Sequence, residues 1–326
     1  MSTAGELGEF GVIARIGARL GAPPPPAGPG DDAAVVGTPD GRVVVTTDLL
    51  AEGVHFRWDW SSPYDVGRKA AAANLADIAA MGAVPTALLV GIALPASTGT
   101  QVLDGLADGL RDECALVGAA IVGGDTIASG DRLTLAITAL GDLQGRAPVT
   151  RAASAPGVLV LAGRVGWSAA GLALLRAGAA MSGLEDLFAA HRRPQPPYAM
   201  GPALAKAGAL AMCDVSDGLI ADVRHLTDAC GGHAEIDPEL LDLDPLLVAA
   251  GDRLGCPPLE WMLTGGEDHA LVAVLPEGVH LPGVRVIGRL DPTPAGHREP
   301  TSGATGGVRV RGRSAGFGAG GHAHFS

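Results

Sequence analysis

The chain has 326 residues, of which 47% are hydrophobic and only 3% are aromatic, and its formal net charge is −12. This length allows two domains with a sizeable core, and that core must be built mainly from Ala, Val and Leu. The negative charge argues against general nucleic-acid binding, which needs a basic surface, but not against a phosphorylated small substrate whose charge is neutralised by metal ions.

Cysteine usage and the apolar pattern indicate the cellular compartment of the protein. The four cysteines form no CxxC pair and have no histidines at zinc-ligand spacing, so reduced thiols are expected. No signal pattern and no apolar run long enough to span a bilayer is found. These features predict a cytoplasmic protein.

The first half of the chain predicts a mixed α/β domain. Apolar residues at helical spacing predict an opening helix over residues 6–20. A proline run then leads to Gly30-Asp31-Asp32 before a short strand at 33–36, and Asp40-Gly41 predicts a hairpin turn. The further predicted strands cover residues 42–48, 86–94, 119–122 and 132–140. Ser61-Ser62-Pro63 predicts the start of a helix whose body covers residues 66–81, because it offers a capping hydroxyl and a proline at the first position, and another helix is predicted at 101–117.

The second half predicts another α/β domain. A stretch rich in Pro, Ala, Gly and Ser at residues 145–157 predicts a boundary that gives domains 1–148 and 149–326. The predicted elements beyond it are strands at 158–162, 211–215, 270–275, 284–287 and 308–310, helices at 168–178 and 219–230, and a proline-rich crossing at 192–202.

Acidic residues recur where the predicted apolar elements end. Thr46-Thr47-Asp48 finishes a strand of valines, and the segments GGDT, CDVSDG and LTGGED follow the same pattern. Carboxylates beside glycines or hydroxyl groups suit a hard cation such as Mg²⁺. Each motif alone also fits an ordinary turn or helix cap, but six in one chain, with Asp31-Asp32 and Asp77 included, are hard to explain as turns.

The predicted helix 66–81 carries a further acid. Asp77 interrupts an alanine-rich apolar helix, and a carboxylate buried there must be paired or metal-bound. Asn74 lies three residues earlier and therefore on the same face.

No nucleotide-binding signature of the common kinds is present. Neither Lys69 nor Lys206 stands in a Walker A frame, and the protein-kinase signatures are missing. If the chain uses ATP, metals held by carboxylates must align its phosphates and neutralise their charge.

A family resemblance follows from seven motifs in register. The chain contains, in this order, GDDAAVV, TTDLLAEGVHF, KAAAANLADIAAMGA, GGDT, TRAASAPG, SDGL and GGEDHAL. From about Glu6 to Leu271 it resembles the thiamine-monophosphate kinases, in the superfamily that includes aminoimidazole ribonucleotide synthetase and selenophosphate synthetase. The resemblance implies an α+β fold of two α/β domains with mixed sheets flanked by helices.

The resemblance also implies an activity. It is the ATP-dependent phosphorylation of thiamine monophosphate to thiamine diphosphate, by direct transfer with several Mg²⁺ ions. The expected assembly is a homodimer paired through its N-terminal domains, with the nucleotide in a cleft between domains.

Site residues carry over position by position. The metal-ligand positions are Asp32, Thr46, Thr47, Asp48, Asp77, Asp125, Asp214 and Asp217. The nucleotide-contacting positions are Gly124, Asp125, Arg151 and Ser216, and those that meet thiamine monophosphate are His55, Glu267 and His322. The catalytic assignment is Asp48, Asp217 and Arg151.

The chain departs from the family pattern at two places. The family usually reads GGEDYEL where this chain has GGEDHAL, so the polar contact at His269 is expected to differ. His322 stands where the family has an aromatic residue against the thiamine end of the substrate. Either this histidine stacks there or Phe317 substitutes for it, and the departure concerns substrate affinity more than catalysis.

Other functions remain open at this stage. A cyclo-ligase resembling aminoimidazole ribonucleotide synthetase would share the ATP and metal chemistry, but the GVHF and GGED segments disfavour it. Selenophosphate synthesis is disfavoured because no cysteine lies in the N-terminal segment. A degenerate relative that binds nucleotide without turnover has no reason to keep all the carboxylates, and the acidic motifs also disfavour a purely structural role.

Overall fold

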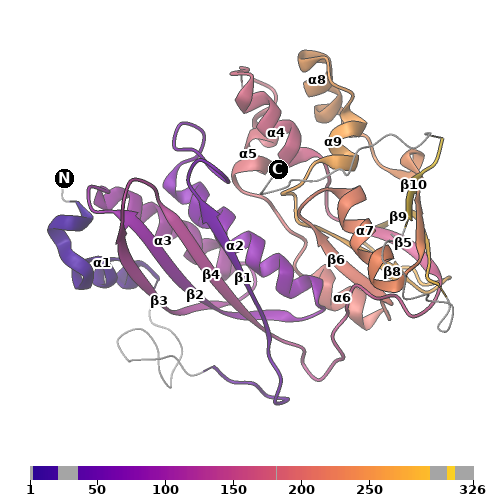
Figure 1. Cartoon of the computed structure of the whole chain (residues 1–326), viewed down its shortest axis with the longest axis horizontal. Coiled ribbons are helices and arrows are strands. Elements are labelled where there is room, and N and C mark those ends of the chain that lie inside the picture. The colour runs from indigo at the N-terminus through magenta and orange to yellow at the C-terminus, as the bar shows by residue number, and fades with distance from the viewer. Residues whose placement is uncertain (1–2, 21–35, 181, 294–306, 313–326) are drawn as a thin grey trace. The chain divides into compact units, whose positions relative to one another are not determined.

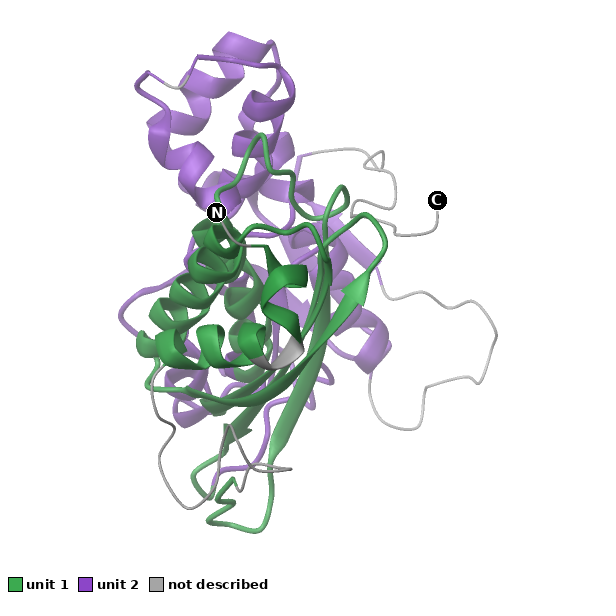
Figure 2. Ribbon diagram, turned by 90° about the vertical axis from the view of Figure 1, so that its left-hand side faces the viewer, with its two compact units in different colours: residues 1–78, 83–145 green, residues 79–82, 146–326 purple. Residues whose placement is uncertain are grey.

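The computed structural model describes residues 3–20, 36–180, 182–293 and 307–312. Asp32, His322 and most of the strand predicted at 33–36 lie outside these ranges. The chain divides into two compact units (Figure 2): unit 1 is residues 1–78 and 83–145, and unit 2 is residues 79–82 and 146–326. Within the described ranges, no helix is long and apolar enough to cross a membrane.

Unit 1 contains a four-stranded mixed sheet in the order β1-β4-β2-β3 (Figure 1). Strands β2 and β3 run parallel, and the other neighbours are antiparallel. Helices α2 and α3 lie on one face of the sheet, and α1 packs against α3. The bounds are α1 (Ala4–Leu20), β1 (Val44–Ala51), α2 (Pro63–Ala80), β2 (Val84–Pro95), α3 (Thr100–Ala115), β3 (Ala120–Ser129) and β4 (Thr134–Asp142).

The start of α2 follows the capping signal in its sequence. Ser62 Oγ accepts a hydrogen bond of 3.2 Å from the Asp65 N–H, and the Ser62 N–H donates one of 2.9 Å to the Asp65 carboxylate. Pro63 occupies the first helical position, where its missing N–H costs nothing. The predicted helix start is confirmed.

The two faces of the unit 1 sheet differ. Along β4, Leu135, Ile137 and Ala139 are buried on the face that the helices cover. On the opposite face, which we call the open face, large apolar side chains remain exposed: Val45 at 61%, Leu49 at 63%, Leu89 at 38% and Ile127 at 59%. An exposed apolar surface of this kind is typical of an interaction site.

Two expectations about strand ends were wrong. Thr46-Thr47-Asp48 lies in the middle of β1, because pairing with β4 continues to Ala51 opposite Thr134. The GGDT segment lies inside β3, because pairing with β2 continues to Ser129. Glycine is required at position 124, where an added Cβ would lie 2.0 Å from the Val90 carbonyl oxygen.

Unit 2 contains a six-stranded mixed sheet in the order β10-β7-β9-β5-β8-β6. The pair β10 and β7 is parallel, and the other pairs are antiparallel. The strands are β5 (Gly157–Ala162), β6 (Ala211–Val215), β7 (His233–Ile236), β8 (Ala270–Leu275), β9 (Val284–Asp291) and β10 (Gly307–Val310). The helices are α4 (Trp167–Arg176), α5 (Glu185–Arg192), α6 (Met200–Lys206), α7 (Leu219–Cys230), α8 (Pro245–Leu254) and α9 (Pro258–Thr264), with a 3-10 turn at Pro238–Leu240.

Both faces of the unit 2 sheet are covered, which explains its continuous apolar strands. Along β8, Ala270, Val272 and Val274 belong to a core shared with α4, α5, α7, α8 and α9. Leu271, Ala273 and Leu275 belong to a second core with α6 and Ala80. Strands buried on both faces read as unbroken apolar runs, and the predictions at 211–215 and 270–275 are confirmed to the residue.

Candidate functional site

Polar side chains of β1 and α2 meet within unit 1. Thr46 Oγ1 donates a hydrogen bond of 2.8 Å to Asp77 Oδ2, and the Asp48 N–H donates one of 3.0 Å to Asn74 Oδ1. Side chains alternate along a strand, so Asp48 lies on the same face as Thr46. The structure therefore brings Thr46, Asp48 and Asp77 together, with the buried Asn74 fixing the strand beside them.

Thr47 and Asp125 lie on the opposite face of the same sheet. Thr47 Oγ1 donates to the Ile137 carbonyl oxygen at 2.9 Å and accepts from Thr138 Oγ1 at 3.2 Å. Strand register places Asp125, which is exposed, on this open face as well. The ligand positions predicted for unit 1 that the structure describes are thus divided between the two faces of the sheet.

His55 is held in the loop between β1 and α2. Its Nδ1 accepts a hydrogen bond of 3.0 Å from the Ala51 N–H, and its carbonyl oxygen accepts one of 3.1 Å from Nζ of the buried Lys69. Since Nδ1 acts as an acceptor, the neutral ring carries its proton on Nε2. Nε2 is therefore the donor nitrogen of the neutral His55 ring.

In unit 2, the SDG and GGED motifs interlock through their backbones. The Glu267 N–H donates to the Ser216 carbonyl oxygen at 2.8 Å, and the His269 N–H donates to that of Val215 at 3.0 Å. Gly266 permits this approach, because an added Cβ would lie 2.1 Å from the Ser216 carbonyl oxygen. Glu267 and His269 have φ angles of 65° and 51°, which L-residues seldom adopt.

The three side chains that follow Gly266 point to three different partners. Glu267 Oε2 lies 3.5 Å from Nδ1 of the buried His191 on α5, which is also 3.1 Å from Ser168 Oγ. The Asp268 carboxylate accepts hydrogen bonds from the N–H groups at the start of α4, at 2.6 and 2.8 Å. His269 Nδ1 lies 3.1 Å from Asp214 Oδ2. The turn is thereby tied to α5, α4 and β6.

Asp268 is a buried carboxylic acid whose pKa is shifted from its usual value. Burial raises the pKa of Asp268 to about 7, although the N–H groups of Ser168 and Gly166 and the charges of Arg164 and His269 act in the opposite direction. Its two contacts with the α4 N-terminus satisfy backbone donors that the helix cannot. Asp268 is therefore a structural cap of α4.

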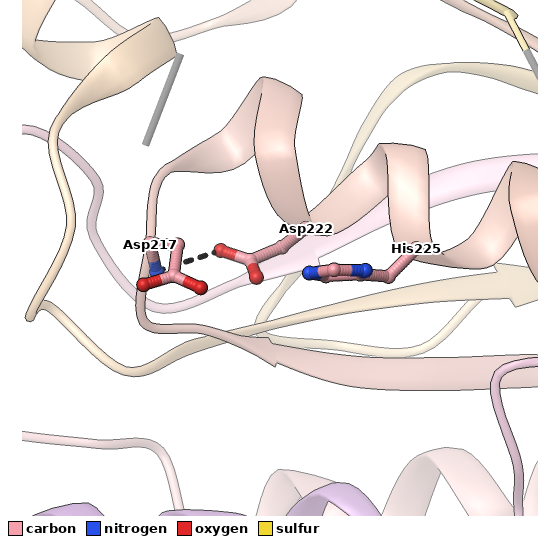
Figure 3. A group of neighbouring side chains, drawn as sticks. All are labelled: Asp217, Asp222 and His225. Atoms are coloured by element: carbon pink, nitrogen blue, oxygen red, sulfur yellow. Dashed lines mark hydrogen bonds between the residues drawn. The ribbon is translucent and has the colours of Figure 1, made fainter. Parts of the chain in front are cut away.

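Asp217, Asp222 and His225 form a group at the start of α7 (Figure 3). One ligand atom from each lies within 4.8 Å of the others. Asp222 Oδ2 accepts hydrogen bonds of 3.0 Å from the N–H groups of Asp217 and Gly218. Burial, followed by the charge of Asp214 and assisted by that of Asp217, raises the pKa of Asp222 to about 7.

The donor set around Asp222 fits a divalent cation. The carboxylates of Asp214 and Asp217 lie close enough to that of Asp222 for their negative charges to oppose its ionisation. Bound positive charge would relieve that repulsion, and carboxylate oxygens are the ligands that Mg²⁺ takes in proteins.

Arg151 lies beside the strand that carries Asp214. The Met212 N–H donates to the Thr150 carbonyl oxygen at 3.0 Å, which places the exposed Arg151 next to β6. Its charge also reaches the neighbouring thiol: burial raises the pKa of Cys213, and Arg151 opposes that rise. Of the other positions predicted to contact the nucleotide, Gly124 is exposed in β3 and Ser216 is partly buried after β6.

Several polar residues of these clusters were not predicted from the sequence. Asp222 and His225 had a usable signal, because they are three residues apart on a predicted helix and so share a face. His191 and Ser168 had none, since they meet Glu267 only through long-range packing of α4 on α5. Gly171 allows that packing, because an added Cβ would lie 2.0 Å from the Leu187 carbonyl oxygen.

Comparisons with known proteins agree with one another. Residues 30–143 match the family model described as AIR synthase related protein, N-terminal domain. The chain is 49% identical over 301 residues to the thiamine-monophosphate kinase of Mycobacterium tuberculosis, covering 89% of this chain and 87% of that protein. It is 42% identical over 298 residues to that of Corynebacterium glutamicum, covering 89% and 88%. A solved structure of AaThiL complexed with AMPPCP and TMP is similar at 30% identity and a TM-score of 0.77, covering 99% of both chains.

Proposed function

The chain belongs to the thiamine-monophosphate kinase family, and from that membership we propose that it transfers a phosphoryl group from ATP to thiamine monophosphate. The product is thiamine diphosphate, and the step belongs to thiamine diphosphate biosynthesis. The observation that carries this function is the near-complete overlap with a solved structure that holds both AMPPCP and TMP.

The acidic clusters fit this chemistry. Phosphoryl transfer asks the protein chiefly to align the reactants and to neutralise charge on the β- and γ-phosphates. Mg²⁺ ions bound to the protein would supply that neutralisation. In unit 1, Asp48 and Asp77 would hold a metal, with Thr46 orienting Asp77. In unit 2, Asp214 and Asp217 would do so, with Asp222 beside them.

The remaining ligand positions keep their predicted roles in this proposal. Asp32 would be a further metal ligand, while Thr47 and Asp125 would act from the open face of the unit 1 sheet. Arg151, exposed beside β6, would bind the nucleotide phosphates, with Gly124, Asp125 and Ser216 lining the nucleotide.

Acceptor recognition is assigned to His55 and Glu267, together with His322. His55 would donate from Nε2 to the phosphate of thiamine monophosphate, since its Nδ1 is engaged by Ala51. Glu267 presents a carboxylate that is 32% exposed, which suits contact with the cationic thiazolium of the acceptor. His322 would face the thiamine end.

We also propose that the protein is a homodimer built on the open face of the unit 1 sheet. Val45, Leu49, Leu89 and Ile127 expose 38–63% of their surface there. Isologous pairing of this face with that of a second copy would cover these side chains. This assembly gives unit 1 a second role, as the dimerisation domain, beside its metal ligands.

The cytoplasm is the proposed location. All four cysteines, Cys114, Cys213, Cys230 and Cys256, are free thiols, which is typical of proteins in a reducing compartment. The proposed partners are thiamine monophosphate and ATP, without nucleic acid or membrane.

An acceptor-dependent assay tests the function. Purified protein is given ATP and Mg²⁺, and ADP release is measured with thiamine monophosphate, with thiamine, and with no acceptor. The proposal predicts release with thiamine monophosphate alone. Equal release in all three, or binding of nucleotide without release, would contradict it.

A further inference from the structure

We propose that His269 is a positioning residue that holds the Asp214 carboxylate in the orientation in which it binds a divalent cation. The inference rests on the proposed function, in which Asp214 is a metal ligand, and it assigns a role to a residue outside the predicted site. His269 itself is expected to touch neither the cation nor the substrates.

The contact between the two side chains is direct and buried. His269 Nδ1 lies 3.1 Å from Asp214 Oδ2, and the side chains are only 9% and 5% exposed. A buried carboxylate must find a hydrogen-bond donor or a positive charge, because water is not there to solvate it. An ionised carboxylate only accepts hydrogen bonds, so an Asp214 carboxylate that acts as a metal ligand requires the proton of His269 on Nδ1.

Main-chain hydrogen bonds fix the backbone of His269, from which the imidazole projects. The His269 N–H donates to the Val215 carbonyl oxygen at 3.0 Å, and the next residue, Ala270, pairs with Val215 as β8 begins. The φ angle of His269 is 51°, so the backbone departs from regular strand geometry at this residue, directly before β8 begins. A non-glycine residue in this conformation signals a local constraint, and here the Asp214 contact supplies one.

The contact uses one of the two carboxylate oxygens of Asp214. His269 meets Oδ2, and a carboxylate has a second oxygen, Oδ1, with which it can bind a cation. Asp214 also acts electrostatically on Asp222 and so lies near the other carboxylates of unit 2. Partners that fix a metal ligand in this way are commonly worth about 10–100-fold in metal affinity.

Two substitutions separate the hydrogen bond from the backbone conformation. Both glycine and asparagine tolerate a positive φ angle, but only asparagine offers an N–H donor close to the position of Nδ1. The test is binding of Mn²⁺, as a spectroscopic substitute for Mg²⁺, to full-length protein without nucleotide, followed by the electron paramagnetic resonance signal of the free ion.

We expect His269→Gly to raise the dissociation constant for the Asp214-dependent Mn²⁺ site about 10-fold or more and His269→Asn to restore it to within about 3-fold. Asp214→Asn identifies the site, and adding His269→Gly to it should change nothing further. Equal affinity in wild type and His269→Gly, or equal losses in the glycine and asparagine variants, would overturn the proposal.

A second measurement decides the matter if His269→Gly does not fold. The ¹⁵N chemical shifts of wild-type imidazoles, assigned by comparison with His269→Asn, report which nitrogen of His269 is protonated. Protonated Nδ1 supports the proposal, and unprotonated Nδ1 overturns it. Neither readout involves thiamine monophosphate, so failure of the proposed kinase activity is detected separately, by the acceptor-dependent assay.

Discussion

Thr46 and Asp77 are joined by a hydrogen bond of 2.8 Å, which links the middle of β1 to a carboxylate on α2. Asp77 is partly exposed, so it can both accept this bond and face a ligand. In the proposed function the bond orients a metal-binding carboxylate, as ligand carboxylates elsewhere are oriented by hydrogen bonds.

Thr46→Val should weaken the use of Mg²⁺. Valine has the shape of threonine but no donor, so Asp77 would lose its fixed orientation. We expect the Mg²⁺ concentration for half-maximal turnover to rise about 10-fold. Thr46→Ser, which keeps the hydroxyl, should remain near wild type. An unchanged Mg²⁺ dependence in Thr46→Val would show that the bond is merely structural.

His55 variants should separate loop structure from acceptor binding. Asparagine can accept the Ala51 N–H as Nδ1 does, but it cannot reach the position of Nε2. His55→Asn is therefore expected to raise KM for thiamine monophosphate about 10-fold or more while KM for ATP stays within about 2-fold, given that a hydrogen bond to a charged group contributes about 1.5–3 kcal/mol. Parallel changes in both KM values would argue against a direct contact with the acceptor.

The sequence predicted those parts of the fold that local rules control. β6 and β8 were predicted to the residue because strands buried on both faces are unbroken apolar runs. The helix α8 was missed although its signals are present: Asp244 caps it, Pro245 begins it, and Gly255 ends it with a φ angle of 66°.

The site was less accessible to sequence reasoning. The Thr-Thr-Asp segment was interpreted as the end of a strand, but it lies within β1. Because side chains alternate along a strand, Thr47 lies on the face opposite Thr46, and the two residues cannot serve one site with their side chains. Glu267 contacts His191, which lies 76 positions earlier in the chain, and His269 contacts Asp214, which lies 55 positions earlier. No local pattern specifies such pairs, because they depend on how α5 and β6 pack against the turn.

Asp268 should give the free energy of unfolding a specific pH dependence. Its pKa is raised to about 7, so between about pH 4 and 7 the folded protein retains a proton that the unfolded chain releases. This group therefore makes unfolding easier as pH rises through that window, by at most about 1.4 kcal/mol per pH unit.

Asp268→Asn removes this titration. Loss of the carboxylate can shift the free energy of unfolding by an amount that does not depend on pH. Beyond that shift, the free energy of unfolding of the variant minus that of wild type should rise from pH 4 to 7 and stay constant above about pH 8. Denaturant unfolding of metal-free protein across this range measures the difference. Parallel stability curves would show that Asp268 is ionised throughout.

Charge on the open face should disrupt the proposed dimer. Leu49 and Leu116 are both 63% exposed, but only Leu49 lies on the open face of the unit 1 sheet. Leu49→Glu is expected to convert dimer to monomer in sedimentation velocity at micromolar concentration, because two carboxylates would be buried across a symmetric interface. Leu116→Glu, the matched control at the end of α3, should remain dimeric. A dimeric Leu49→Glu would place the interface elsewhere.

The central claim is direct transfer of a phosphoryl group to thiamine monophosphate, and label transfer tests it most directly. ATP labelled with ³²P at the γ-position is incubated with the protein, Mg²⁺ and thiamine monophosphate, and the products are separated and identified by mass. The account predicts labelled thiamine diphosphate in equal amount to ADP, and its loss in Asp48→Asn, whereas Asp59→Asn at an exposed surface ion pair stays active. Label released as inorganic phosphate, with thiamine monophosphate unchanged, would contradict it.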